Sequence, residues 1–116
     1  MFEAQYLIGD RSVYSPWMSR GGDKLIITVD VMQLSSGTLT VEPLTKNSED
    51  TDDGAAVTGT ALSITAASTT ATSSSTFSGL EELIRYKFSW NATASSDYVL
   101  FRMLSPVWFD TVNAGT

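Results

Sequence analysis

Residues 24–34 have the sequence KLIITVDVMQL, and the spacing of apolar residues in this stretch decides the fold class. Four large apolar side chains occupy every second position: Leu25, Ile27, Val29 and Val31. A period of two is that of a β-strand, whereas a helix repeats every ~3.6 residues. The stretch therefore predicts a strand with one fully apolar face.

The same alternation recurs along the chain, most clearly in residues 83–90 (LIRYKFSW) and 97–104 (DYVLFRML). Weaker strand patterns cover residues 3–8, 38–46 and 57–66. Short strands separated by polar turns are typical of antiparallel all-β domains. The sequence predicts a single all-β domain over residues 1–116, an antiparallel β-sandwich of six to eight strands. Its connectivity, jelly-roll or immunoglobulin-like, stays open.

Local signals add detail to this outline. The link Ser35-Ser36-Gly37 predicts a β-hairpin between the strands on either side. Pro43 lacks a backbone N–H, so it should lie at a sheet edge or a bulge. Ser78 and Glu81 match a capping box, which predicts one helical turn at most.

Two segments lack the apolar residues that a fixed structure needs. Eleven of the sixteen residues from 63 to 78 are Ser or Thr, and we expect an exposed loop around residues 68–76. Residues 112–116 should form a frayed tail.

The chain contains neither cysteine nor histidine, which excludes disulfides, thiolate metal sites and the catalytic triads or dyads that use either residue. Glu81 and Glu82 are adjacent, so on a strand they point to opposite faces and cannot flank a substrate as a pair. We therefore expect no catalytic residues, no cofactor and no enzymatic activity.

The acidic loop Asp50-Thr51-Asp52-Asp53-Gly54 is the one candidate for a metal site, because Ca²⁺ is bound by several carboxylates together. It departs from the EF-hand pattern, since the glycine comes one position early and no Glu follows at the required distance. A solvated loop is the simpler interpretation. We assign no metal site, and calcium binding by residues 50–54 stays open.

Charge and hydropathy exclude two classes of partner. The formal net charge is −6, and the seven basic residues are dispersed, whereas nucleic-acid binding needs clustered Lys and Arg. No apolar run reaches the ~18 residues of a membrane span. The start of the chain, residues 1–5, lacks the basic and apolar segments of a secretory signal, which predicts synthesis in the cytoplasm without a signal peptide.

The sequence also has more apolar surface than one small domain is expected to bury. The strands at 24–34 and 97–104 are apolar on much of both faces, and aromatic flanks at 14–18 and 107–109 add to this surplus. Either a partner covers this surface, or the chain's own loops do. The candidate interface residues are Tyr14, Trp17, Met18, Arg20, Arg102, Trp108 and Phe109.

Three segments resemble virion proteins: Ser15-Pro16-Trp17, Lys46-Asn47-Ser48-Glu49-Asp50 and Arg85-Tyr86-Lys87-Phe88. With its short length and Ser/Thr-rich loops, the chain resembles the small capsid decoration (cement) and related structural proteins of tailed bacteriophages. The resemblance implies a non-enzymatic subunit that binds the major capsid protein or another shell protein at the capsid surface. It also implies a homo-oligomer, often a trimer.

A second interpretation is a carbohydrate-binding or receptor-recognition module of a fibre or tail. Exposed aromatic rings can stack against sugars, and the candidates are Tyr14, Trp17, Trp90 and Trp108. Trp90 ends an apolar alternation, so we expect it in the core.

Overall fold

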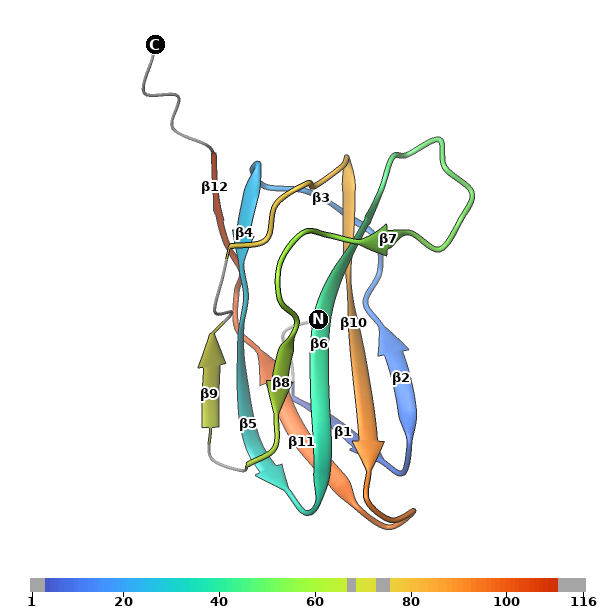
Figure 1. Ribbon diagram of the computed structural model, residues 1–116, viewed down its shortest axis with the longest axis vertical. Coiled ribbons are helices and arrows are strands. Elements are labelled where there is room, and N and C mark those ends of the chain that lie inside the picture. Colours follow the sequence, from blue (N-terminus) through green and yellow to red (C-terminus); the bar gives the residue numbers. More distant parts are fainter. Residues whose placement is uncertain (1–3, 67–68, 73–75, 111–116) are drawn as a thin grey trace.

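The computed structural model describes residues 4–66, 69–72 and 76–110, which form twelve β-strands and no helix (Figure 1). The strands are β1 (Gln5–Ile8), β2 (Arg11–Tyr14), β3 (Met18–Ser19), β4 (Lys24–Ile26), β5 (Thr28–Leu34), β6 (Gly37–Lys46), β7 (Ala55–Ala56), β8 (Leu62–Ile64), β9 (Thr69–Thr72), β10 (Leu83–Ala92), β11 (Tyr98–Met103) and β12 (Val107–Phe109). The all-β prediction is confirmed for this part of the chain. No helix that could cross a membrane occurs in it.

The strands form two larger antiparallel sheets and a short pair. One sheet has the order β1-β11-β5-β9, and the other has the order β2-β10-β6-β7, with β3 also on β10 and β8 also on β6. The pair β12-β4 extends the first sheet, because β4 leads into β5 and β11 leads into β12 (Figure 1). In the same way β3 follows β2 along β10, and β7 and β8 both pair with β6. If each such pair of consecutive strands is counted as one crossing of the sheet, the twelve strands make eight crossings.

The inner faces of the two larger sheets share one hydrophobic core. Phe88 of β10 and Phe101 of β11 belong to different sheets, and their ring centroids lie 5.3 Å apart. The alternating residues of 24–34 and 83–90 supply much of the core: Leu25, Ile27, Val29, Val31, Ile84, Tyr86, Phe88 and Trp90. Each such side chain contributes roughly 1.5–3 kcal/mol when it is fully buried. The period-two strand predictions are therefore confirmed at these two segments.

The predicted hairpin between residues 24–34 and 38–46 is wrong, because β5 and β6 belong to opposite sheets. The chain crosses between the sheets at Ser35 and Ser36, whose backbone groups bond to Tyr98 and Thr93. Gly37 permits this crossing: its φ is +145°, and a Cβ there would lie 2.4 Å from the carbonyl oxygen of Asn91. β6 instead pairs with β10 over ten residue pairs, a longer ladder than a local hairpin would provide.

The expected loop at residues 68–76 is also corrected in part. Residues 69–72 form β9, which pairs antiparallel with β5 at the edge of the four-stranded sheet. An edge strand gains backbone hydrogen bonds whatever its side chains are, and threonine is favourable in strands. Low apolar content therefore did not prevent a strand here. Residue 68, residues 73–75 and the predicted tail at 112–116 lie outside the described residues.

The predicted helical turn at Ser78 is absent as well. Phe77 exchanges two backbone hydrogen bonds with Leu25, at 2.8 and 3.1 Å, and its side chain is buried. In a capping box the N–H of Glu81 would bond to the Ser78 side chain. That N–H donates to Thr45 Oγ1 instead, at 2.7 Å. Burial of Phe77 thus outweighs the local capping signal.

Pro43 lies where its missing N–H has no cost. It is opposite Tyr86 on β10, but the N–H and C=O of Tyr86 both bond to Ser15, on the other side of β10. The pairing of β6 with β8 ends at Val41, and its pairing with β7 begins at Leu44. Pro43 therefore occupies a break in pairing along one side of an inner strand.

Tyr86 carries a polar atom in the core without a partner. Its side chain has no exposed surface, and its hydroxyl has no hydrogen-bond partner among the described residues. Burial raises the pKa of the Tyr86 phenol well above its usual range. The neutral phenol is therefore favoured by folding, and stability falls once the pH exceeds the unfolded-state pKa of about 10.

We predict that Tyr86→Phe raises the free energy of unfolding by roughly 1 kcal/mol, because it removes a buried hydroxyl that gains nothing in return. Urea unfolding measures this change, with Tyr98→Phe on a half-exposed tyrosine as the control. In an alkaline titration of the original protein, Tyr86 should ionise only when the protein unfolds. The Tyr86→Phe variant should therefore lack the part of the phenolate absorbance that rises with unfolding and should keep the rest. A clearly less stable Tyr86→Phe protein would show that the hydroxyl has a partner.

Candidate functional site

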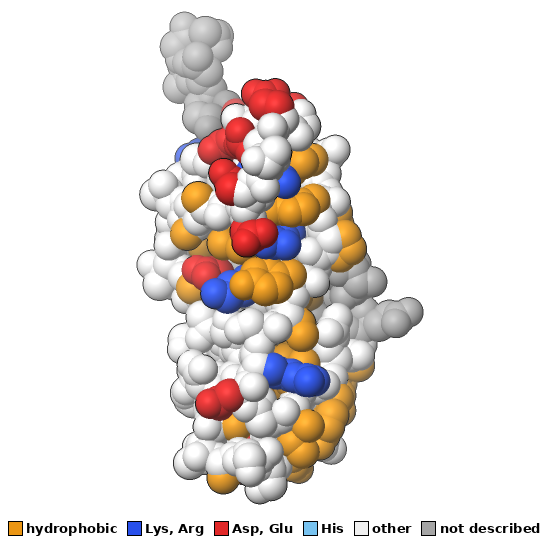
Figure 2. All heavy atoms as spheres, turned by 90° about the vertical axis from the view of Figure 1, so that its right-hand side faces the viewer, with side chains coloured by type: hydrophobic (Ala, Val, Ile, Leu, Met, Phe, Trp, Pro, Cys, Tyr) orange, Lys and Arg blue, Asp and Glu red, His pale blue; other side chains and the backbone are white. Residues whose placement is uncertain are grey.

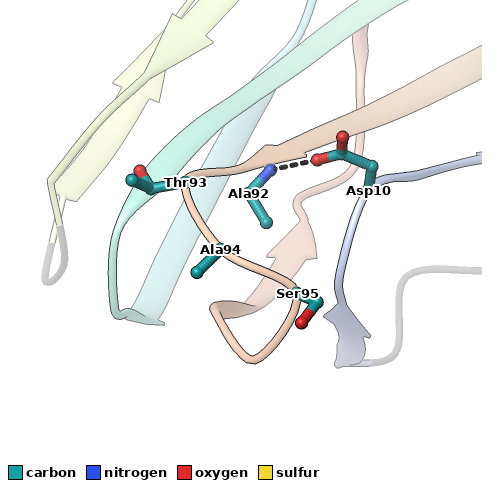
Figure 3. A pocket seen from close by; sticks show the side chains of 5 residues that line it. All are labelled: Asp10, Ala92, Thr93, Ala94 and Ser95. Atoms are coloured by element: carbon teal, nitrogen blue, oxygen red, sulfur yellow. Dashed lines mark hydrogen bonds between the residues drawn. The ribbon is translucent and has the colours of Figure 1, made fainter.

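A small pocket lies beside the turn between β10 and β11 (Figure 3). Its volume is about 240 Å³, and it is lined by Asp10, Ala92, Thr93, Ala94 and Ser95. The Asp10 carboxylate points toward Ala92 and accepts its backbone N–H at 2.7 Å (Figure 3). The pocket therefore holds a single carboxylate that already has a structural partner, and no second acid or base lines it.

The acidic loop uses part of its carboxylate groups for its own conformation. Asp50 accepts the N–H of Asn47 at 3.0 Å, and Asp52 accepts that of Gly54 at 2.8 Å. Within the described ranges, no three acidic residues lie close enough to hold a metal ion. The calcium hypothesis for residues 50–54 gains no support from this geometry.

The outer face of the six-stranded sheet carries a row of alternating aromatic and basic side chains. The guanidinium of Arg85 lies 4.3 Å from the ring centroid of Tyr14 and 4.7 Å from that of Trp17. Lys46 lies 4.8 Å from the Trp17 ring, and Lys87 lies 5.9 Å from the Tyr14 ring. Figure 2 shows this side of the molecule, where orange and blue side chains interleave below a group of red ones.

This aromatic–basic row holds the 47–54 loop against the sheet. Arg85 Nη2 donates to the carbonyl oxygen of Asp53 at 2.9 Å, and Lys46 Nζ donates to that of Asp50 at 3.3 Å. Trp17 packs so closely on Gly54 that a Cβ there would lie 2.5 Å from the indole. The cations of the row are thus engaged with rings and loop carbonyls, and its evident role is structural.

The outer face of the four-stranded sheet is different in character. Five large hydrophobic side chains are exposed in the described part of the chain: Tyr6, Ile8, Tyr14, Val107 and Phe109. All except Tyr14 belong to this sheet or its β4-β12 extension. Tyr6 and Ile8 flank the buried Leu7 along β1, so their side chains point outward. Val107 and Phe109 flank Trp108, which lies opposite the buried Leu25, so they point outward as well.

Half-exposed apolar residues join these four into a longer surface. Leu100 lies opposite Tyr6, Tyr98 lies opposite Ile8, and Ile26 lies opposite Val107. The rings of Tyr6 and Tyr98 stack at 5.6 Å. We call this surface, made of Tyr6, Ile8, Ile26, Tyr98, Leu100, Val107 and Phe109, the apolar face. An Arg102–Asp30 ion pair at 3.4 Å interrupts it near its middle.

The predicted interface residues do not form one site. Tyr14 and Trp17 belong to the aromatic–basic row, whereas Arg102 and Phe109 belong to the opposite sheet. Met18 packs against the core, and Arg20 Nη1 donates to the Leu80 carbonyl oxygen at 2.8 Å.

Trp108 is partly buried and lies on the same side of its strand pair as the buried Leu25. It packs against the core, and its indole covers Gly21, where a Cβ would lie 2.6 Å from Cγ.

The candidate residues chosen from the sequence do not include Tyr6, Ile8 and Val107, which the structure exposes. On a strand, Tyr6 and Ile8 must face away from a core that holds Leu7. Parity does not identify Val107, because the odd-numbered Met103 is buried whereas Val107 is exposed. The alternation breaks in residues 104–106, which are not part of a strand.

Comparison with family models, with curated proteins and with solved structures gives no match to this chain.

We predict that Arg85→Met, which keeps the aliphatic stem and removes the guanidinium, loosens the 47–54 loop. The loss of two cation–π contacts and of the bond to Asp53 should lower the free energy of unfolding by roughly 1–2 kcal/mol. Limited proteolysis should then cut the loop faster than in the original protein. Lys87→Met, whose ammonium has only the longer contact, is the matched control; equal effects of the two changes would contradict the assigned role of Arg85.

Proposed function

We propose that the chain is a non-enzymatic structural subunit that binds an assembled shell, as a capsid decoration (cement) protein of a tailed bacteriophage. The observation that carries this proposal is the apolar face, which holds four of the five exposed large hydrophobic residues described. Exposed apolar clusters, here on both sides of the Arg102–Asp30 ion pair, are typical of surfaces that bind a partner.

The apolar face is long in one direction. From Tyr98 to Phe109 it runs about 40 Å, at ~3.3 Å per residue. Aromatic residues such as Tyr6, Tyr98 and Phe109 are the side chains that most often supply the binding energy of an interface.

A subunit of this kind stabilises a shell by mass action. If it binds the assembled lattice and not the separated shell subunits, its binding free energy adds to the stability of the lattice. Binding of this kind needs no chemistry at the site.

The strand order supports a jelly-roll over an immunoglobulin-like sandwich. We count the pairs β2/β3, β4/β5, β7/β8 and β11/β12 as one crossing each and number the eight crossings along the chain. The two sheets then have the orders 1-8-3-6 and 2-7-4-5. Two interleaved Greek keys of eight strands produce this order, and such jelly-rolls are frequent in viral capsid and lectin domains. We therefore propose the jelly-roll connectivity.

The carbohydrate-binding alternative has weaker support from the geometry. Of its candidate rings, Trp90 is buried and Trp108 is turned inward. The rings of Tyr14 and Trp17 already have cations over them. A sugar would have to displace these contacts in order to stack.

We predict that the double variant Val107→Thr/Phe109→Thr weakens binding to assembled shells by roughly 10- to 100-fold, because it removes two exposed anchors. The β-branched Thr favours the strand conformation at both positions of β12. Cosedimentation with assembled shells and with dissociated shell subunits measures binding. Tyr14→Thr, on the opposite sheet, is the matched control and should bind as the original protein does. Unchanged binding of the double variant, or no binding of the original protein to shells, would contradict the proposal.

A further inference from the structure

β1 forms one edge of the four-stranded sheet, with β11 as its only strand neighbour among the described residues. A free edge presents unpaired backbone N–H and C=O groups, which can pair with a strand of another chain. The register shows which residues of β1 carry these groups.

Alternate residues of an antiparallel strand direct their backbone groups to opposite sides. Tyr98 bonds through both of its backbone groups to Ser35, on the β5 side of β11. Ile8, opposite Tyr98, therefore turns its N–H and C=O away from β11, and so does Tyr6, two residues earlier. The N–H of Gly9, the next residue, points the other way and donates to the carbonyl oxygen of Asp97 at 3.0 Å, as this alternation requires. No described residue pairs with the outward groups of Tyr6 and Ile8.

This edge lacks the features that usually prevent strand pairing. Natural edge strands carry charges, prolines or bulges, or are very short. β1 has the sequence QYLI, with none of these residues and a regular four-residue register. At the corresponding edges of the other sheet, β2 begins with Arg11 and is followed by Pro16, and β7 and β8 have two and three residues.

We propose that β1 pairs antiparallel with β1 of a second copy, about a two-fold axis that passes midway between the Leu7 residues of the two copies. In this register Tyr6 of one copy lies opposite Ile8 of the other, and both pairs exchange two backbone hydrogen bonds. The contact is self-complementary and closes as a dimer. It brings together two edges that carry no charge, although each chain has a net charge of −6.

The pairing joins the two four-stranded sheets into one sheet of eight strands. The side chains of Tyr6 and Ile8, which are 53% and 46% exposed, then lie side by side on its outer surface. The apolar faces of both copies become continuous, which doubles the surface that the proposed function assigns to a shell. The dimer itself forms without any shell protein.

Light scattering of the pure protein over a range of concentrations tests the proposal. The expected mass is twice the 12.5 kDa of one chain. Tyr6→Lys/Ile8→Lys should be monomeric, because like charges face each other across the two-fold axis. The variant Tyr6→Lys/Ile8→Glu loses the same two side chains, but in this register the lysine of one copy lies opposite the glutamate of the other. It should therefore recover the dimer, at least tenfold tighter than the Lys/Lys variant.

Three results would overturn the proposal: a monomer at every concentration, a dimer that survives in the Lys/Lys variant, or a Lys/Glu variant that associates no better than Lys/Lys. Circular dichroism of both variants checks that each remains folded. Val107→Thr/Phe109→Thr should remain dimeric, since β12 lies away from the β1 edge. A dimer that does not bind shells would refute the proposed function alone, and a shell-binding monomer would refute the edge pairing alone.

Discussion

Every other feature of the molecule depends on the burial of one apolar row from each sheet against the other. Leu25, Ile27, Val29 and Val31 have no exposed surface, and they face the alternating row that ends at Trp90. Once these rows point inward, strand parity determines which side chains point outward. The character of both outer faces, and hence the proposed function, follows from this one constraint.

The two outer faces have different roles because their residues differ. On the six-stranded sheet, Arg85 and Lys46 stack on aromatic rings and hold a loop through its carbonyl oxygens. On the four-stranded sheet, Tyr6, Ile8, Val107 and Phe109 remain exposed with no loop over them in the described part of the chain. The first face completes the fold, whereas the second is available to a partner.

Sequence periodicity predicted the strands whose core residues alternate, because that pattern is local. It did not predict the partner of each strand. Ser35-Ser36-Gly37 looked like a hairpin link, but β6 gains a ten-pair ladder with β10 in the other sheet. Residues 69–72 form a strand through backbone pairing that their side chains do not signal. The inward direction of Trp108 follows from its register opposite Leu25, which the local sequence does not reveal.

Hydroxyl-radical labelling of the protein, free and bound to an assembled shell, measures directly which face a partner covers. We expect Tyr98 and Phe109 on the apolar face to become protected on binding, whereas Tyr14 on the opposite sheet should be labelled equally in both states. Protection of Tyr14 with unchanged labelling of Phe109 would place the partner on the aromatic–basic row and would refute binding through the apolar face.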